Sequence, residues 1–88
     1  MDLIREIEKT FSRIEKLFTA GELVEFPSTA EDALCLYHFS LGVWIRNNLI
    51  YPAESGLRDL FEENGITRPD DMSAFIIREF HKYAVRII

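Results

Sequence analysis

Hydrophobic residues recur every three or four positions in several long segments of the chain, which is the spacing of one face of an α-helix. The clearest segment runs from Asp2 to Ala20 and is followed by Gly21, a residue that favours a left-handed helix C-terminus. Its apolar positions are Leu3, Ile4, Ile7, Phe11, Ile14, Leu17 and Phe18. We predict an amphipathic helix there. A connection follows at residues 22–27, because Pro27 disfavours helix at the preceding residue.

A second helix is predicted from Ser28 to about Asn48. Ser28 and Glu31 have the spacing of a capping box, in which each side chain accepts a hydrogen bond from the backbone of the other residue. Apolar residues cover nearly the whole circumference of this helix between residues 33 and 45. Such a helix is typically surrounded by others. We therefore expect it to be the most buried element, with Trp44 in the core.

Two shorter patterns predict the remaining helices. One contains Leu57, Leu60 and Phe61 and ends at Asn64-Gly65, which is typical of a helix C-terminus. After Arg68-Pro69, either Asp70 or Asp71 is expected to cap the last helix. The apolar face of this helix is formed by Met72, Phe75, Ile76, Phe80, Tyr83, Ala84 and Ile87. No alternating strand pattern competes with this interpretation. The sequence predicts an all-α fold, a compact four-helix single domain over residues 1–88 with a buried central second helix.

Composition narrows the class of protein. The hydrophobic fraction of 48% and the charged fraction of 28% are typical of soluble globular proteins and not of disordered chains. The N-terminus interleaves acidic and apolar residues, so it lacks the apolar stretch of a signal peptide, and no apolar run approaches the length of a membrane span. Cys35 is the only cysteine, which excludes an intrachain disulfide and a structural zinc site. We expect a cytoplasmic protein without a metal or cofactor.

The negative charge is concentrated in the middle of the chain. Of the net charge of −5, residues 22–71 carry −7, with ten acidic and three basic residues, whereas residues 72–88 carry +2. Such a field repels nucleic acid and anionic lipid and speeds association with a basic partner. The candidate partner-binding residues are Glu54, Asp59, Glu62 and Glu63, with Glu31 and Asp32 as additions. The alternative is an acidic face that serves only solubility.

Polar residues interrupt the apolar second helix at regular intervals. His38, Gly42 and Arg46 are spaced i, i+4 and i+8, so they share one face, and the glycine leaves a notch beside which Asn47 lies. A small ligand or a nucleotide would fit such a notch. In the alternative, structural interpretation, Gly42 allows another helix to approach closely. His38 then bonds to a carbonyl, and Arg46 pairs with Asp70 or Asp71.

Several short motifs resemble a known family. The motifs are Tyr37-His38-Phe39, Leu41-Gly42, Trp44-Ile45-Arg46-Asn47-Asn48 and Pro69-Asp70-Asp71-Met72-Ser73. They are similar to the paired signatures of a small, uncharacterised bacterial helical family, a domain of unknown function, over roughly residues 28–85. Members have a tryptophan-rich segment after the Arg-Asn pair and a histidine before Pro-Asp-Asp, where this chain has residues 49–52 and Arg68. The resemblance implies a link between Arg46 and the Asp70-Asp71 turn, and no chemistry.

The sequence contains no complete catalytic or metal-binding motif, and three functions remain open. The first is an inhibitor or immunity-type protein that docks a basic protein surface through the acidic residues. The second is a small-ligand or nucleotide-binding domain that uses the His38, Gly42 and Arg46 notch. The third is a degenerate helical ribonuclease-like subunit, since Arg46-Asn47 ends a helix, although Tyr51 stands where such a nuclease would need histidine.

Overall fold

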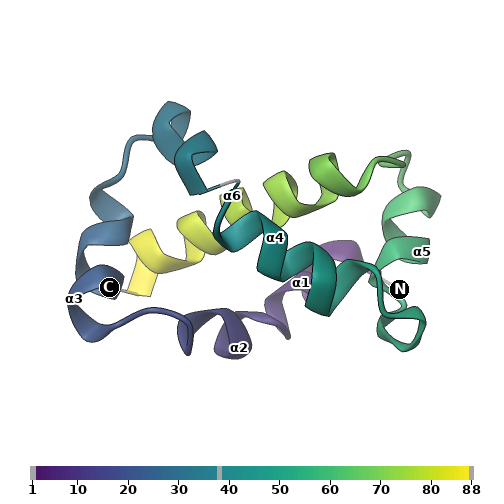
Figure 1. Ribbon diagram of the computed structural model, residues 1–88, viewed down its shortest axis with the longest axis horizontal. Coiled ribbons are helices and arrows are strands. Elements are labelled where there is room, and N and C mark those ends of the chain that lie inside the picture. The colour runs from purple at the N-terminus through teal and green to yellow at the C-terminus, as the bar shows by residue number, and fades with distance from the viewer. Residues whose placement is uncertain (1, 38, 88) are drawn as a thin grey trace.

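The computed structural model describes residues 2–37 and 39–87. Within these residues it contains helices and no β-strand, which confirms the all-α class (Figure 1). The elements in chain order are α1 (Leu3–Glu8), α2 (Phe11–Glu15), α3 (Ala20–Glu25), η1 (Phe26–Ser28), η2 (Glu31–Tyr37), α4 (Leu41–Ile45), η3 (Arg46–Ile50), η4 (Ala53–Ser55), α5 (Leu57–Glu63) and α6 (Pro69–Ile87). Of the η segments, η3 is a π-helix and the others are 3₁₀-helices. The expectation of four helices is therefore wrong, because the described part of the chain forms six α-helices.

The central helix is α6. It runs through the middle of the molecule and contacts α1, α4, α5 and the segments η1, η2 and η3 (Figure 1). One face of α6 is buried along its length, at Met72, Ser73, Ile76, Ile77, Phe80 and Ala84. The other elements lie around this face because it offers the longest continuous apolar surface in the chain, and burial of apolar surface drives folding.

The predicted second helix is neither continuous nor central. Its residues are divided among η1, η2, α4 and η3, and Ser28 ends η1 instead of capping a long helix. Leu36 is 76% exposed and Phe39 is 85% exposed, so its apolar circumference is not buried. Trp44 also departs from the prediction, since it is half-buried at the edge of the core with the Arg13 guanidinium 5.7 Å from its ring centroid. Apolar residues on all sides of this segment indicated burial, yet among its described residues only Leu34, Leu41 and Ile45 belong to the buried core.

The predicted first helix is broken at Thr10. The Thr10 hydroxyl donates a hydrogen bond of 2.6 Å to the Ile7 carbonyl oxygen, and the Thr10 backbone N–H donates to the same oxygen at 2.9 Å. Threonine side chains bond to the backbone of the preceding turn in this way and bend helices. The break between α1 and α2 keeps Ile7, Phe11 and Ile14 buried while the chain changes direction.

A capping box begins α3, where a connection was predicted. The Thr19 hydroxyl accepts a hydrogen bond from the Glu22 backbone N–H at 3.1 Å, and the Glu22 carboxylate accepts from the Thr19 N–H at 2.8 Å. Thr19 and Glu22 have the same spacing as Ser28 and Glu31. The structure therefore forms a capping box at Thr19 and Glu22, whereas the sequence reasoning placed one at Ser28 and Glu31.

We expect the Glu22 carboxyl to titrate at lower pH than an ordinary glutamate. The backbone N–H of Thr19, and then its side chain, stabilise the charged carboxylate and lower the Glu22 pKa. Because the pKa is lower in the folded state, the capping interaction is complete above the usual glutamate range and is lost as the pH falls through the lowered value. Carboxyl NMR titration of the wild type and of Thr19→Ala should show a higher Glu22 pKa in the variant, and Thr19→Ser should retain the low one. Equal pKa values in Thr19→Ala and the wild type would contradict this assignment.

A cluster of aromatic rings joins the N-terminal helices to α6. Phe80 is fully buried, and its ring centroid lies 5.5 Å from that of Phe11, 5.7 Å from Phe18 and 5.4 Å from Phe26. Phe26 is also fully buried and contacts the Tyr37 ring edge-on at 5.1 Å. Aromatic pairs at these separations stabilise a core beyond the area that they bury. This cluster is the packing centre of the end of the molecule that holds α3.

Candidate functional site

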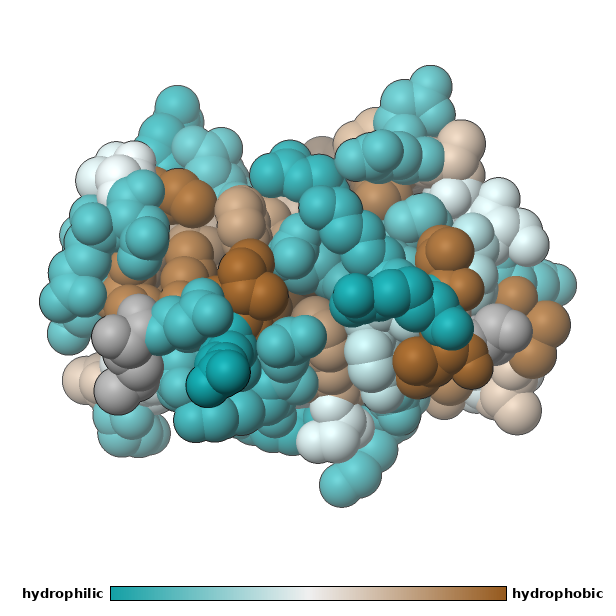
Figure 2. All heavy atoms as spheres, turned by 180° about the vertical axis from the view of Figure 1, so that it is seen from behind, coloured by the Kyte–Doolittle hydropathy of each residue, from teal (hydrophilic) through white to brown (hydrophobic). Residues whose placement is uncertain are grey.

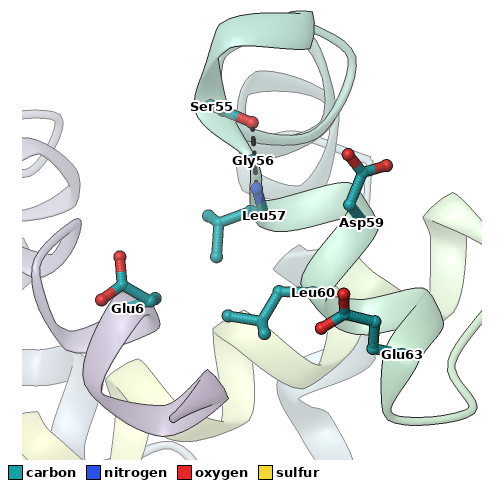
Figure 3. Close-up of a pocket in the computed structure, with 7 residues that line it drawn as sticks. All are labelled: Glu6, Ser55, Gly56, Leu57, Asp59, Leu60 and Glu63. Atoms are coloured by element: carbon teal, nitrogen blue, oxygen red, sulfur yellow. Dashed lines mark hydrogen bonds between the residues drawn. The ribbon is translucent and has the colours of Figure 1, made fainter. Parts of the chain in front are cut away.

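A groove of about 470 Å³ lies between α1 and α5 (Figure 3). Its lining residues are Glu6, Ser55, Gly56, Leu57, Asp59, Leu60 and Glu63. Leu57 and Leu60 extend from α5 towards the helix that carries Glu6 and form an apolar wall (Figure 3). Seen from behind, apolar surface is recessed between hydrophilic side chains at this end of the molecule (Figure 2). The groove thus combines an apolar wall with the carboxylates of Glu6, Asp59 and Glu63.

The local sequence explains how α5 presents these carboxylates. Gly56 has a φ of +71°, a left-handed conformation that glycine adopts without strain, and it starts α5 directly after η4. The Ser55 hydroxyl accepts a hydrogen bond of 3.3 Å from the Leu57 N–H at the first turn. Because Leu57, Leu60 and Phe61 form the buried face, the acidic residues of the helix point outwards. The helix ends at Glu63, before Gly65 with a φ of +84°, which confirms the predicted C-terminus.

The predicted partner-binding residues fall into two groups. Glu54, Asp59, Glu62 and Glu63 are all exposed on η4 and α5, and of these Asp59 and Glu63 line the groove. Glu31 and Asp32 lie elsewhere, on η2, where they line a different groove with Arg78 of α6. The structure therefore does not join these two residues to the α5 group.

Sequence reasoning missed Glu6. It lies among the basic residues Arg5 and Lys9 of the first helix, and Lys9 pairs with it at 2.7 Å. The structure nevertheless places Glu6 in the wall of the α1–α5 groove. Nothing in the sequence near Glu6 signals this position, because it depends on the packing of α1 against α5.

Arg46 links η3 to the start of α6. Its guanidinium Nη1 donates a hydrogen bond of 2.8 Å to the Ser73 hydroxyl and lies 3.6 Å from the Asp70 carboxylate. The Ser73 hydroxyl in turn donates to the Asp70 carbonyl oxygen at 3.0 Å. The Arg46 side chain is 13% exposed and that of Asp70 is 62% exposed, while Asp71 is exposed in the same first turn. The nearest partner of Arg46 is thus the buried Ser73, a residue that the sequence did not single out.

Two residues of the predicted ligand notch, Gly42 and Arg46, are described in structural positions. Gly42 is buried within α4, and Arg46 is engaged by Ser73 and Asp70. Asn47 is exposed on η3, and His38 lies outside the described residues. These positions favour the structural role of Gly42 and Arg46, in which the glycine permits close packing and the arginine ties η3 to α6.

The described part of the chain has neither a cluster of metal ligands nor a helix suited to a bilayer. Among residues 2–37 and 39–87, no three His, Cys, Asp or Glu side chains come together as metal ligands would. No helix in this part of the chain combines the length and the apolar character needed to cross a bilayer.

Comparison with known proteins gives one match. The family model of a domain of unknown function, DUF6794, matches residues 5–84. The match confirms the resemblance to a domain-of-unknown-function family and extends it beyond the motifs to nearly the whole chain. No curated protein and no solved structure matches significantly.

Proposed function

We propose that this chain, which belongs to the DUF6794 family, is a non-catalytic protein-binding module that docks a basic protein surface through the α1–α5 groove. The observation that carries the proposal is the arrangement of Glu6, Asp59 and Glu63 around an apolar wall of Leu57 and Leu60 (Figure 3). An inhibitor or immunity-type protein that covers the basic surface of its target is the form of binding that we favour.

The groove suits a single lysine or arginine side chain of a partner. These side chains lay their aliphatic stems along apolar surface and keep the charged head in a polar environment. Leu57 and Leu60 would contact the stem, and the carboxylates of Asp59 and Glu63 would receive the cation. The residues that contribute most of the binding energy of an interface are usually buried anchor side chains surrounded by a rim of other residues.

The two alternative functions have less support. A ligand or nucleotide site on α4 needs an open notch and a free cation, whereas Gly42 is buried and Arg46 already bonds to Ser73. The same contact holds the arginine that a ribonuclease-like function would use. We therefore propose neither.

The test first captures the partner by affinity purification from a lysate of the native host with this chain as bait. Its association with the chain is then measured by surface plasmon resonance at low and at physiological salt. Asp59→Asn combined with Glu63→Gln should slow association roughly tenfold at low salt and flatten its salt dependence, because exposed carboxylates act mainly by steering the encounter. The melting temperature should stay nearly unchanged, since both side chains are exposed.

A matched control is available on η2. Glu31→Gln combined with Asp32→Asn removes the same two charges from a different groove and should leave association close to that of the wild type. If both double variants slow association equally, net charge and not the α1–α5 groove governs binding. If neither does, the acidic groove does not dock the partner.

A further inference from the structure

A second groove, of about 310 Å³, lies between the α2–α3 segment and the η2–α4 segment. Its lining residues are Leu17, Phe18, Glu22, Tyr37, Ser40, Leu41 and Trp44. None of these residues lines the α1–α5 groove, and α5 and α3 occupy opposite ends of the molecule (Figure 1). The groove is therefore independent of the proposed acidic docking site.

Exposed apolar side chains border this groove. Leu17 lines it and is 43% exposed, while Val43 is 42% exposed beside Trp44. Phe39 and Leu36, the two most exposed large apolar residues of the described chain, adjoin the lining residues Ser40 and Tyr37. Exposed apolar side chains that gather about a groove are typical of an interaction site.

The groove has a basic end and an acidic end. At one end the Arg13 guanidinium lies 5.7 Å from the Trp44 ring centroid, and Lys16 is one turn further along the same stretch of chain. At the other end Tyr37 packs on Phe26, the C-cap of α3, and Glu22 of α3 lines the groove. Glu25 follows Glu22 by three residues, so it lies on the same side of α3. Apolar surface separates the two charged ends.

We propose that this groove binds a second copy of the chain in a two-fold symmetric dimer. A two-fold axis brings the same patch of both copies together in opposite directions, so each end meets the opposite end of its partner. Arg13 and Lys16 of one copy then face Glu22 and Glu25 of the other, at both ends of the interface. The apolar part of the interface, which includes Phe39 and Val43, is buried between the copies. A surface with positive charge at one end, negative charge at the other end and apolar residues between them is self-complementary.

Phe39→Ser tests the apolar part of the proposed interface. Because the side chain is 85% exposed, little buried surface is lost with it, and a thermal melt of the variant checks that it is folded. The dimer dissociation constant, measured by sedimentation equilibrium, should rise at least tenfold, as for a buried aromatic anchor. Trp44 is the only tryptophan, so its emission should shift to shorter wavelength with rising protein concentration in the wild type and not in the variant.

Exchange of the charges at the two ends of the groove tests how the two copies are oriented in the dimer. Lys16→Glu alone should weaken the dimer because it places like charges against the acidic end of the other copy, and Glu25→Lys alone should do the same at the other end. Both changes in one chain restore opposite charges at each end, so the dissociation constant should return towards the wild-type value. Asp59→Asn with Glu63→Gln, in the other groove, should leave dimerisation unchanged.

Three results would overturn the proposal. One is a wild-type chain that stays monomeric at every concentration that sedimentation can reach, which would leave the groove open to a different partner. Another is a dimer that Phe39→Ser does not weaken. The third is a double variant, Lys16→Glu with Glu25→Lys, that dimerises as weakly as the single variants. This result would exclude the two-fold arrangement.

Discussion

Phe80→Ala is expected to destabilise the protein by about 3–5 kcal/mol, the range for removal of a buried aromatic ring from a core. Phe80 is fully buried, and the rings of Phe11, Phe18 and Phe26 pack around it from three segments of the chain. A domain of this size has a total stability of about 5–15 kcal/mol, so the loss is a large share. Thermal denaturation followed by circular dichroism should show a midpoint lower by roughly 15 °C or more, or no cooperative transition.

Val85→Ala is the matched control for this prediction. It shortens an apolar side chain on the same helix, five residues after Phe80, but Val85 is 54% exposed. Its effect should be within about 0.5 kcal/mol. Comparable destabilisation by both substitutions would show that the aromatic cluster is not the packing centre described here.

Arg46→Ala is expected to cost about 1–3 kcal/mol, the range for losing a hydrogen bond to a charged group. Arg46 donates to Ser73, whose buried hydroxyl keeps its own bond to the Asp70 carbonyl oxygen after the substitution. The Asp70 carboxylate is mostly exposed, so water solvates it when the guanidinium is removed. Removal of one partner from an ion pair buried on both sides would instead cost about 3–5 kcal/mol.

A double-mutant cycle with Ser73→Ala and Asp70→Asn distinguishes the two partners of Arg46. Chemical denaturation should give a coupling energy of about 1 kcal/mol or more between Arg46 and Ser73, and a smaller one between Arg46 and Asp70. The 3.6 Å separation of Nη1 from the Asp70 oxygen is beyond hydrogen-bonding distance, which is why the second value should be small. A larger coupling to Asp70 would show that the ion pair holds η3 to α6.

Some local features could be read from the sequence because their causes are local. The period of the apolar residues predicted α6, and the Asn64-Gly65 pair predicted the end of α5. The spacing of the acidic residues of α5 also predicted that their side chains would face solvent, because Leu57, Leu60 and Phe61 occupy the other face. Each of these features depends on residues within two helical turns of one another.

The sequence was misleading where two local signals had equal strength. Thr19-x-x-Glu22 and Ser28-x-x-Glu31 are equivalent capping signatures, and only tertiary packing decided that the first would start α3. The long apolar segment at residues 33–45 predicted a buried central helix, yet Leu36 and Phe39 are exposed. The spacing of apolar residues shows how much apolar surface a segment is able to bury. Which other segments cover that surface depends on the packing of the whole chain.

By itself, the sequence determined the all-helical class, the position of the last two helices and the concentration of acidic residues in the middle of the chain. Only the tertiary structure decided that α6 is central, that Glu6 joins Asp59 and Glu63 at one groove, and that Ser73 is the closest partner of Arg46. The physical reason is the range of the interactions. Helix formation and capping act over a few residues, whereas the grooves and the Arg46 contact require segments far apart in sequence to meet, which follows from burial of one shared core.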